Sequence, residues 1–465
     1  MIGSTVITAR YAPYARVLGR SFLEHHPGAR FAVLVADDVE GTVEVDPAFE
    51  TLTPGDIGID DAELHRRALA FDGQGLTCSM KAALLRHLVA GIEDAALMLD
   101  ADSCVYGDLE PLAELARRHG TVITPHSTVP RDDIDLDRMI IRTGAFNSGL
   151  LAVDDGARAF LDWWHVRIAR RCIPEPGTGV FNEQAWLDLV PGLFDHHVLR
   201  DPGCNASGFA MHYRDVVWRN GTPALPDGPL RHFHFLCGFD PHRPEMLTTV
   251  PAIGVHWPSL EERPGLARLA REYAERLLAA GYDEARAAAA PFDRLPDGQD
   301  TTPLMRRLYR DTLIEADATG APQPPNPWDA GTEAFLAWLN QPIGGPQPAP
   351  SRYLLALWAE RPDLMAAFPD VPGADSGTYL AWAATKPDAE HDHIPAALAP
   401  AHPEAAAMPA GPEAAGELAA ERDRLARDFD LLRRSRSWRL TAPARFAAVR
   451  LRAARARRRP PPAGA

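Results

Sequence analysis

Two aspartates one residue apart are the side chains of this sequence best suited to chemistry. Asp100 and Asp102 flank Ala101 and directly follow the apolar run Leu97-Met98-Leu99. Because residues i and i+2 of an extended segment face the same way, the two carboxylates can share one cation. Mg²⁺ and Mn²⁺ prefer oxygen ligands and usually keep phosphate oxygens in their shell. The pair therefore predicts Mn²⁺ or Mg²⁺ bound beside a diphosphate, whose charge the ion would neutralise as a sugar–diphosphate bond breaks.

The elements that must position this pair alternate between strand and helix from residue 1 to about 258. The predicted strands are Ser4–Thr8, Phe31–Val35, Ala95–Leu99, Thr121–Thr124 and Gly149–Val153. The predicted helices cover Pro13–His25, Asp60–Ala70 and Thr77–Val89, and another begins at the cap Asp155. Such alternation favours an α/β fold with a mostly parallel sheet and helices on both faces. Ligands bind at the carboxyl ends of strands in these sheets, where Asp37 and the aspartate pair lie.

Several segments occur in the order typical of a known enzyme class. They are the Asp100/Asp102 pair, Phe146-Asn147-Ser148-Gly149, Asn182-Glu183-Gln184, Asn205 and a late histidine. The layout over residues 1–258 resembles the GT-A fold glycosyltransferases, which have a Rossmann-like, mostly parallel mixed sheet. It is most similar to glycosyltransferase family 8 and related bacterial polysaccharide glycosyltransferases.

The resemblance implies a role for each matching segment. The loop after the first strand would hold the nucleotide base, and the segment around Asn147 would meet the donor sugar. Glu183 and Gln184 match the dyad near the reacting carbon, and Lys81 would meet the diphosphate. The residues expected to bind the donor are Thr8, Ala9, Tyr11, Tyr14, Asp37, Lys81, Asp100, Ala101, Asp102, Phe146, Asn147, Ser148 and Asn205.

The third metal ligand in the family is a histidine late in the domain. His232 and His234 alternate on one predicted strand, and His234 is preferred because the following Gly238-Phe239-Asp240-Pro241 nearly keeps the bacterial pattern. The chain departs from the family by one extra residue before Gly238, by the absence of a Lys-Pro-Trp ending, and by Glu183 in place of Asp. The resemblance implies transfer with retention of anomeric configuration, with the leaving phosphate taking the acceptor proton.

Three other interpretations stay open. The Asp100/Asp102 pair also looks like the nucleophile motif of haloacid dehalogenase phosphatases, but the one Lys after Asp102 is Lys386. A sugar-phosphate nucleotidyltransferase would need a Gly-rich loop after the first strand, and Thr8–Pro13 has no glycine. The third interpretation is a non-catalytic scaffold in a polysaccharide assembly complex. Hydrolysis of a nucleotide-sugar donor in the presence of Mn²⁺ would argue against this interpretation.

Composition limits the location and the partners that can be expected for the protein. The chain has 465 residues, a net charge of −15 and five scattered cysteines, which argue against a disulfide framework. It shows no apolar run near the length of a membrane span and no secretory signal at Met1, so a cytoplasmic location is expected. An acidic body argues against nucleic-acid binding. The expected partners are a nucleotide-sugar donor, with a UDP-sugar favoured by the resemblance, and a glycan or lipid-linked acceptor; the oligomeric state is open.

The remaining organisation is predicted from residue 259 onward. An all-α accessory module is expected over 259–385, a Pro/Ala-rich linker over 386–412, and a charged helix with an Arg-rich tail over 413–465. Eleven Arg and no acid occur from Arg433 to Arg459. Aromatic and apolar residues among these arginines, such as Trp438, favour peripheral contact with an anionic membrane at the inner face of the cell membrane.

Overall fold

The computed structural model of the chain separates into two compact units, Met1–Gly377 and Thr378–Ala465. It describes residues 1–90, 94–130, 132–175, 180–207, 211, 214–235, 237–249, 259–288, 290–344, 348–384 and 394–400. The boundary predicted at residue 258 lies outside these residues. The same is true of the predicted linker and tail, apart from residues 394–400.

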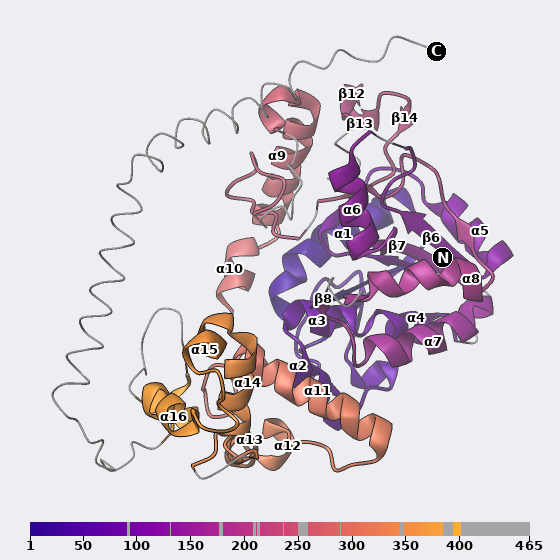
Figure 1. Ribbon diagram of the computed structural model, residues 1–465. Helices are drawn as coiled ribbons and strands as arrows, with labels where there is room; N and C mark the ends of the chain where they lie inside the picture. Colours follow the sequence, from indigo (N-terminus) through magenta and orange to yellow (C-terminus); the bar gives the residue numbers. More distant parts are fainter. Residues whose placement is uncertain are drawn as a thin grey trace, which may run out of the picture. The chain divides into compact units, whose positions relative to one another are not determined.

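Among the described residues, seven strands form the central sheet (Figure 1). They are β1 Ile2–Ile7, β2 Arg30–Val35, β3 Glu50–Leu52, β4 Ala96–Leu99, β6 Thr121–Pro125, β7 Phe146–Val153 and β10 His197–Val198. Their order is β10-β6-β7-β4-β1-β2-β3, and β7 runs antiparallel to both of its neighbours while the other pairs are parallel. The prediction of a mostly parallel mixed sheet flanked by helices is confirmed.

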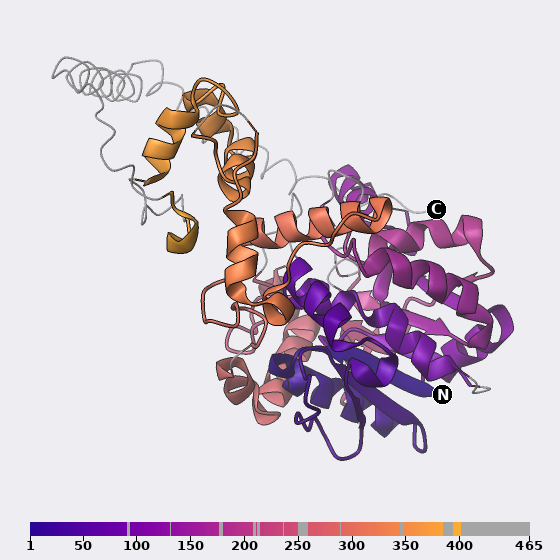
Figure 2. The ribbon, with the colours of Figure 1, turned by 90° about the horizontal axis from the view of Figure 1, so that it is seen from below.

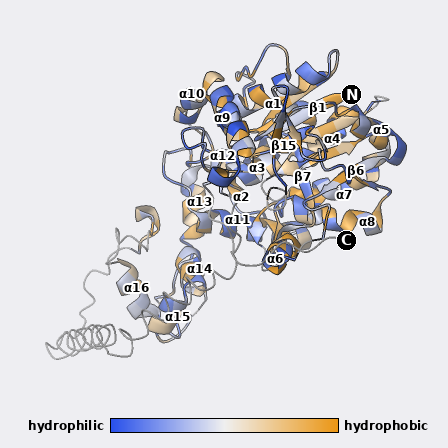
Figure 3. Cartoon of the chain, turned by 90° about the horizontal axis from the view of Figure 1, so that it is seen from above, coloured by the Kyte–Doolittle hydropathy of each residue, from blue (hydrophilic) through white to orange (hydrophobic). Residues whose placement is uncertain are grey.

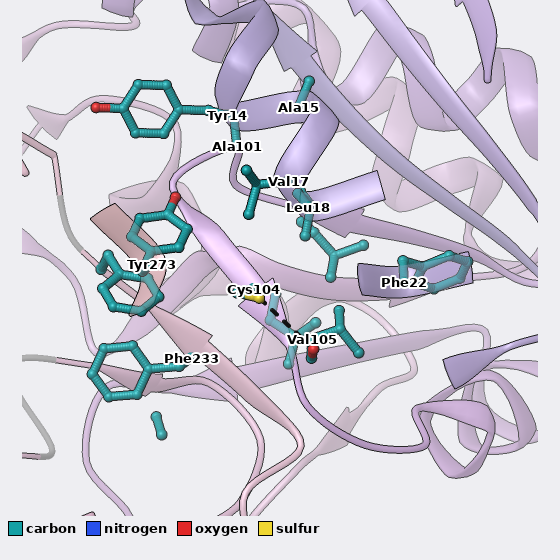
Figure 4. Close-up of a cluster of buried hydrophobic side chains, with 14 of the residues drawn as sticks. Tyr14, Ala15, Val17, Leu18, Phe22, Ala101, Cys104, Val105, Phe233 and Tyr273 are labelled. Atoms are coloured by element: carbon teal, nitrogen blue, oxygen red, sulfur yellow. Dashed lines mark hydrogen bonds between the residues drawn. The ribbon is translucent and has the colours of Figure 1, made fainter. Parts of the chain in front are cut away.

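Alternate residues of the strands face opposite sides of the sheet, and each side is covered by helices. Leu97 and Leu99 of β4 join the hydrophobic cluster that contains Leu18 and Phe22 of α1 (Ala12–His25). Figure 4 shows Val17 and Leu18 of α1 in the same cluster as Cys104 and Val105, whereas the Tyr14 ring points away from these two residues. On β4, Met98 alternates with this pair, and α4 (Lys81–Val89) packs against both β4 and α7 (Arg158–Ile168).

Burial of apolar side chains on both faces explains the uninterrupted apolar run that ends at Leu99. The four residues of β4 are buried without exception. Figure 3 shows hydrophobic colouring concentrated on the strands and on the inward faces of their flanking helices.

A smaller sheet carries the late histidines next to the aspartate pair. It consists of β11 (Ala206–Ser207), β15 (His232–His234) and β5 (Ser103–Val105) in that order. Antiparallel pairing of β15 with β5 places His234 opposite Ser103. Since β5 begins one residue after Asp102, this register brings the histidine to the acids.

Two local predictions about the helices are wrong. The helix predicted over Thr77–Val89 is split into α3 (Gly73–Cys78) and α4, because the Ser79 carbonyl accepts a hydrogen bond from the buried Arg67 guanidinium at 2.8 Å. The predicted cap Asp155 is also displaced by one residue. Asp154 is the capping residue, and it accepts from the Gly156 N–H before the short turn η3 (Asp155–Ala157) that leads into α7.

The region after the sheet is helical, as predicted, with α9 (Pro264–Ala279) and α10 (Tyr282–Ala287) packed against α1. Figures 1 and 2 show α11 (Pro303–Thr319) beside α2 (Asp61–Ala70), in agreement with their contacts. The other helices are α5 Glu110–His119, α6 Ile134–Thr143, α8 Val190–Leu193, α12 Pro327–Ala330, α13 Thr332–Leu339, α14 Arg352–Glu360, α15 Pro362–Ala367 and α16 Ser376–Ala384. The remaining strands are β8 Pro174–Glu175, β9 Val180–Phe181, β12 Val217–Arg219, β13 Thr222–Leu225 and β14 Gly228–Pro229.

None of the described helices combines the length and the apolar character that crossing a bilayer requires.

Candidate active site

Asp100, Asp102 and His234 converge at the carboxyl end of β4. His234 Nε2 lies 3.0 Å from Asp102 Oδ1 and 3.8 Å from Asp100 Oδ2. Each of the three residues has one possible ligand atom, a carboxylate oxygen or an imidazole nitrogen, that lies within 4.8 Å of those of the other two. Backbone bonds hold this arrangement, because the Asp100 N–H donates to the Gly149 carbonyl and the Asp102 carbonyl accepts from the Phe235 N–H. Two carboxylates and an imidazole at this spacing fit a single Mn²⁺ or Mg²⁺ ion.

The charges within this trio influence one another before any cation binds. Burial alone would lower the pKa of His234, but the adjacent Asp102 carboxylate raises it above its ordinary value. Burial would raise the pKa of Asp102, whereas His234 holds it below its ordinary value. The histidine and the aspartate thus stabilise each other's charged forms.

The hydrogen-bond network indicates where the His234 proton lies. The Gly149 N–H donates to Asn147 Oδ1 at 2.8 Å, so the Asn147 amide must present its Nδ2 to the other side. That Nδ2 donates to Asn205 Oδ1 at 2.8 Å and faces His234 Nδ1 at 3.2 Å. When the imidazole is neutral, Nδ1 is the acceptor, and the proton lies on Nε2 and is donated to Asp102. A cation at Nε2 would take the place of this proton, so the two compete for one atom.

Gly149 is the residue of β7 that lets the strand approach the acids. A Cβ atom there would lie 2.7 Å from Asp100 Oδ2 and 3.0 Å from Asn147 Oδ1, closer than carbon and oxygen tolerate. Asn147 and Ser148 are almost fully buried beside it, at 2% and 1% exposure. The strand therefore brings an amide and a hydroxyl to the acid pair only because position 149 has no side chain.

Lys81 lies at the centre of a second network that joins the acids to Glu183. Its ammonium donates to Asp100 Oδ1 at 2.6 Å, to Glu183 Oε1 at 2.5 Å and to Ser148 Oγ at 3.2 Å. Burial alone would lower the pKa of Lys81, but the carboxylates of Asp100 and Glu183 hold it well above its ordinary value. All three N–H groups of Lys81 are engaged by neighbouring side chains, and its contact with a donor diphosphate stays a prediction.

The segment with Glu183 and Gln184 is anchored on both sides. The Glu183 carbonyl accepts from the Trp164 indole at 3.0 Å, and the preceding Asn182 adopts the left-handed conformation with φ of 48°. The Gln184 amide donates to the Thr143 carbonyl at 2.8 Å. The Glu183 carboxylate therefore joins the Lys81 network, whereas the nitrogen of the Gln184 amide is held by α6.

The loop after β1 lies beside the same site and is held by Asp37. The Asp37 carboxylate accepts from the Ala9 N–H at 2.8 Å, and burial raises its pKa. Tyr11 stacks on Tyr14 with ring centroids 4.9 Å apart, and the Tyr14 hydroxyl donates to the Phe239 carbonyl at 3.0 Å.

The other expected donor-binding residues lie as follows. Thr8 follows β1 and is half-buried, Phe146 begins β7 and is half-buried, and Ala101 is buried in the hydrophobic cluster at 8% exposure. The individual roles of all these residues remain predictions.

Three further buried residues lie beside the site: His232, the less favoured of the two late histidines, and Cys78 and Cys172, which the sequence did not single out. His232 is fully buried, and neither of its ring nitrogens has a hydrogen-bond partner among the described residues. Cys78 and Cys172 lie close to Glu183, and a mutual hydrogen bond together with burial raises the pKa of Cys78 well above its ordinary value. The cysteines are 94 residues apart in the sequence, so no local spacing could have paired them.

Comparison with known proteins gives few sequence relatives. No protein-family model matches the chain. It is 29% identical over 147 residues to the uncharacterized protein YfnF of Bacillus subtilis (strain 168), a match that covers 30% of this chain and 47% of that protein. The chain thus spans about half the length of this curated relative.

The solved structures that the chain is similar to are glycosyltransferases. The galactosyltransferase LgtC, solved with donor and acceptor sugar analogues, is 18% identical with a TM-score of 0.34, covering 60% of this chain and 96% of LgtC. GlyE of Streptococcus pneumoniae TIGR4 is 14% identical with a TM-score of 0.35, over 62% of this chain and 66% of GlyE. Mouse xyloside xylosyltransferase 1 is 14% identical with a TM-score of 0.33, over 51% of this chain and 98% of that enzyme. The function proposed next rests on the geometry of the site.

Proposed function

We propose that the chain is a metal-dependent glycosyltransferase that moves a sugar from a nucleoside-diphosphate donor to a glycan or lipid-linked acceptor. A UDP-sugar is the favoured donor, and retention of anomeric configuration is expected; both follow from the family resemblance of the sequence. The observation that carries the proposal is the convergence of Asp100, Asp102 and His234 at the end of β4, next to Asn147 and Ser148 of β7.

The proposed roles follow from the contacts of each side chain. Asp100, Asp102 and His234 would hold a divalent cation, which when bound supplies positive charge to the departing diphosphate. Asn147 and Ser148 would orient the sugar through its hydroxyls, since both are buried polar groups beside the acids.

Glu183 would stabilise positive charge that develops on the reacting sugar carbon. Lys81 holds the Glu183 carboxylate in place, because its ammonium donates to that carboxylate at 2.5 Å. Ser148 donates to the same oxygen at 2.5 Å, so a sugar held by Ser148 would lie close to Glu183.

A thermal-unfolding screen tests the proposal. Wild type is titrated with UDP-, GDP- and dTDP-sugars with and without Mn²⁺, alongside Asp102→Asn and the surface control Asp227→Asn. A donor at 100 times its Kd should stabilise wild type and the control by about 2.7 kcal/mol in Mn²⁺, and Asp102→Asn far less. Absence of any Mn²⁺-dependent stabilisation of wild type by every donor would contradict the proposal.

The stereochemical outcome has its own test. The anomeric proton coupling of the first product formed, measured by NMR, should match that of the donor sugar. An inverted product would contradict the expected retention and leave the transferase proposal intact.

The Arg-rich segment Arg433–Arg459 supports peripheral contact with an anionic membrane as part of this proposal, at the inner face of the cell membrane. The full chain should float with vesicles that contain anionic lipid and stay behind with neutral ones. Equal flotation with both would contradict the membrane contact.

A further inference from the structure

Two cysteines and Glu183 form a second group of side chains with the geometry of metal ligands. Cys78 Sγ, Cys172 Sγ and a carboxylate oxygen of Glu183 all lie within 4.8 Å of one another. The three residues are buried, at 8%, 1% and 3% exposure respectively. The group shares no residue with the proposed Mn²⁺ or Mg²⁺ site, so it can take a cation of its own.

Contacts between three separate segments hold the group together. The first cysteine is the last residue of α3. A Cβ atom at Gly75 of this helix would lie 2.9 Å from the Cys172 carbonyl, so α3 packs directly against the segment that follows α7. The Asn182 N–H donates to the Ile173 carbonyl at 2.8 Å, which brings Glu183 beside Cys172. The fold therefore assembles the three side chains through the backbone of each segment.

Glu183 has a carboxylate oxygen left for a cation. Lys81 and Ser148 each donate to Glu183 Oε1 at 2.5 Å. Both of these hydrogen bonds go to Oε1, and among the described residues none goes to Oε2. The carboxylate can therefore keep its contact with Lys81 and still offer lone pairs to a metal ion.

The charges of the group balance when a divalent cation is bound. The hydrogen bond with Cys172, together with burial, raises the pKa of Cys78 well above its ordinary value, and burial raises the pKa of Cys172. A metal ion replaces both thiol protons, which pass to the solvent as the two metal–sulfur bonds form. Two thiolates and the Glu183 carboxylate then carry three negative charges, and the cation and the Lys81 ammonium carry three positive ones.

The sulfur ligands decide which metal suits the group. Thiolates select soft ions such as Zn²⁺, whereas Mn²⁺ and Mg²⁺ prefer oxygen ligands. Bonds of about 2.0–2.3 Å to a tetrahedral Zn²⁺ place its ligand atoms about 3.5 Å apart, so shifts of about 1 Å bring the three atoms onto one ion. Three protein ligands leave the fourth position of the tetrahedron to a water molecule.

We propose that Cys78, Cys172 and Glu183 bind Zn²⁺ or a similar thiophilic divalent cation. The ion would join the end of α3, the segment after α7 and the Glu183 segment to one another. This inference goes beyond the proposed function and requires no donor. Because the three ligands come together only in the folded chain, Zn²⁺ should raise the thermal unfolding midpoint of wild type.

Titration of the reduced, metal-free full chain with Cd²⁺ tests the inference, because Cd²⁺ bound to thiolate has an ultraviolet charge-transfer band. Wild type should show this band, saturating at one Cd²⁺ per chain, and Zn²⁺ should abolish it by competition. Cys78→Ser and Cys172→Ser should lose most of the band, and Glu183→Gln should bind Cd²⁺ about tenfold more weakly or worse. The control Cys204→Ser, which removes a buried thiol outside the group, should match wild type.

The outcomes keep this inference separate from the proposed function. Absence of the band in wild type, or its persistence in both Cys78→Ser and Cys172→Ser, would overturn the inference. Equal Cd²⁺ affinity of Glu183→Gln and wild type would also overturn it, and this variant keeps both thiols should the serine variants fail to fold. Asp102→Asn should keep the band while it loses Mn²⁺-dependent stabilisation by the donor, so each proposal can fail without the other.

Discussion

Removing the Lys81 ammonium while keeping its bulk, as in Lys81→Met, should strongly destabilise the protein. The side chain is 4% exposed and donates three hydrogen bonds, to Asp100, Glu183 and Ser148. Without the ammonium, two carboxylates remain close together and without a counter-charge. Breaking a buried ion pair by removing one partner costs about 3–5 kcal/mol, and we expect Lys81→Met to lie in this range.

The companion variant Glu183→Gln should cost less, about 1.5–3 kcal/mol, because Lys81 would keep Asp100 as a partner. In the double variant, residue 183 is a neutral amide, so removal of the ammonium leaves Asp100 but no longer Glu183 as a carboxylate without its partner. The combined loss should therefore be smaller than the sum of the single losses by about 2 kcal/mol or more.

Urea unfolding of wild type, both single variants and the double variant measures this coupling directly. Metal-free buffer keeps cation binding from contributing to the result. Additivity within about 0.5 kcal/mol would show that Lys81 and Glu183 do not depend on each other, and would refute the network described for the site.

Two further predictions concern pH and the close approach at β7. Burial lowers the pKa of His232 to about 3, so the unfolded state binds more protons below pH 6.5 and stability falls as pH falls. Between pH 6.5 and 5, wild type should lose about 2 kcal/mol more than His232→Gln in urea unfolding, and equal losses would contradict this. Gly149→Ala should displace the Asp100 carboxylate, which would lie 2.7 Å from the new Cβ, and weaken Mn²⁺ binding about tenfold or more by calorimetry. The control Gly228→Ala meets no atom within 4 Å, and equal Mn²⁺ affinity in both variants would contradict the argument.

The parts of the fold that local pattern encodes were predictable. The apolar run of β4 and the acids that follow it predicted a buried strand and a polar site at its end, and both the strand and the grouping of the acids are present. The helical character expected from residue 259 onward is likewise present in α9 and α11. These features can be predicted from the sequence because a helix or strand with a buried face shows a regular pattern of apolar residues.

Features set by distant contacts were not predictable in this way. The interruption between α3 and α4 depends on Arg67, which lies 12 residues before the carbonyl it bonds. The partners of Lys81, which are 19 and 102 residues away, are likewise not apparent from local sequence.

The most direct test of the central claim is the release of nucleoside diphosphate from a nucleotide sugar, with and without Mn²⁺. Wild type and the surface control Asp227→Asn should release the diphosphate in Mn²⁺ and lose this activity in a chelator. The unfolding midpoint of Asp102→Asn should show that this variant is folded. Its rate of diphosphate release should be at least about 100-fold lower than that of wild type, as expected when about 2.7 kcal/mol of transition-state stabilisation is lost. The account would be contradicted if Asp102→Asn released the diphosphate at the wild-type rate, or if the chelator did not reduce release by wild type.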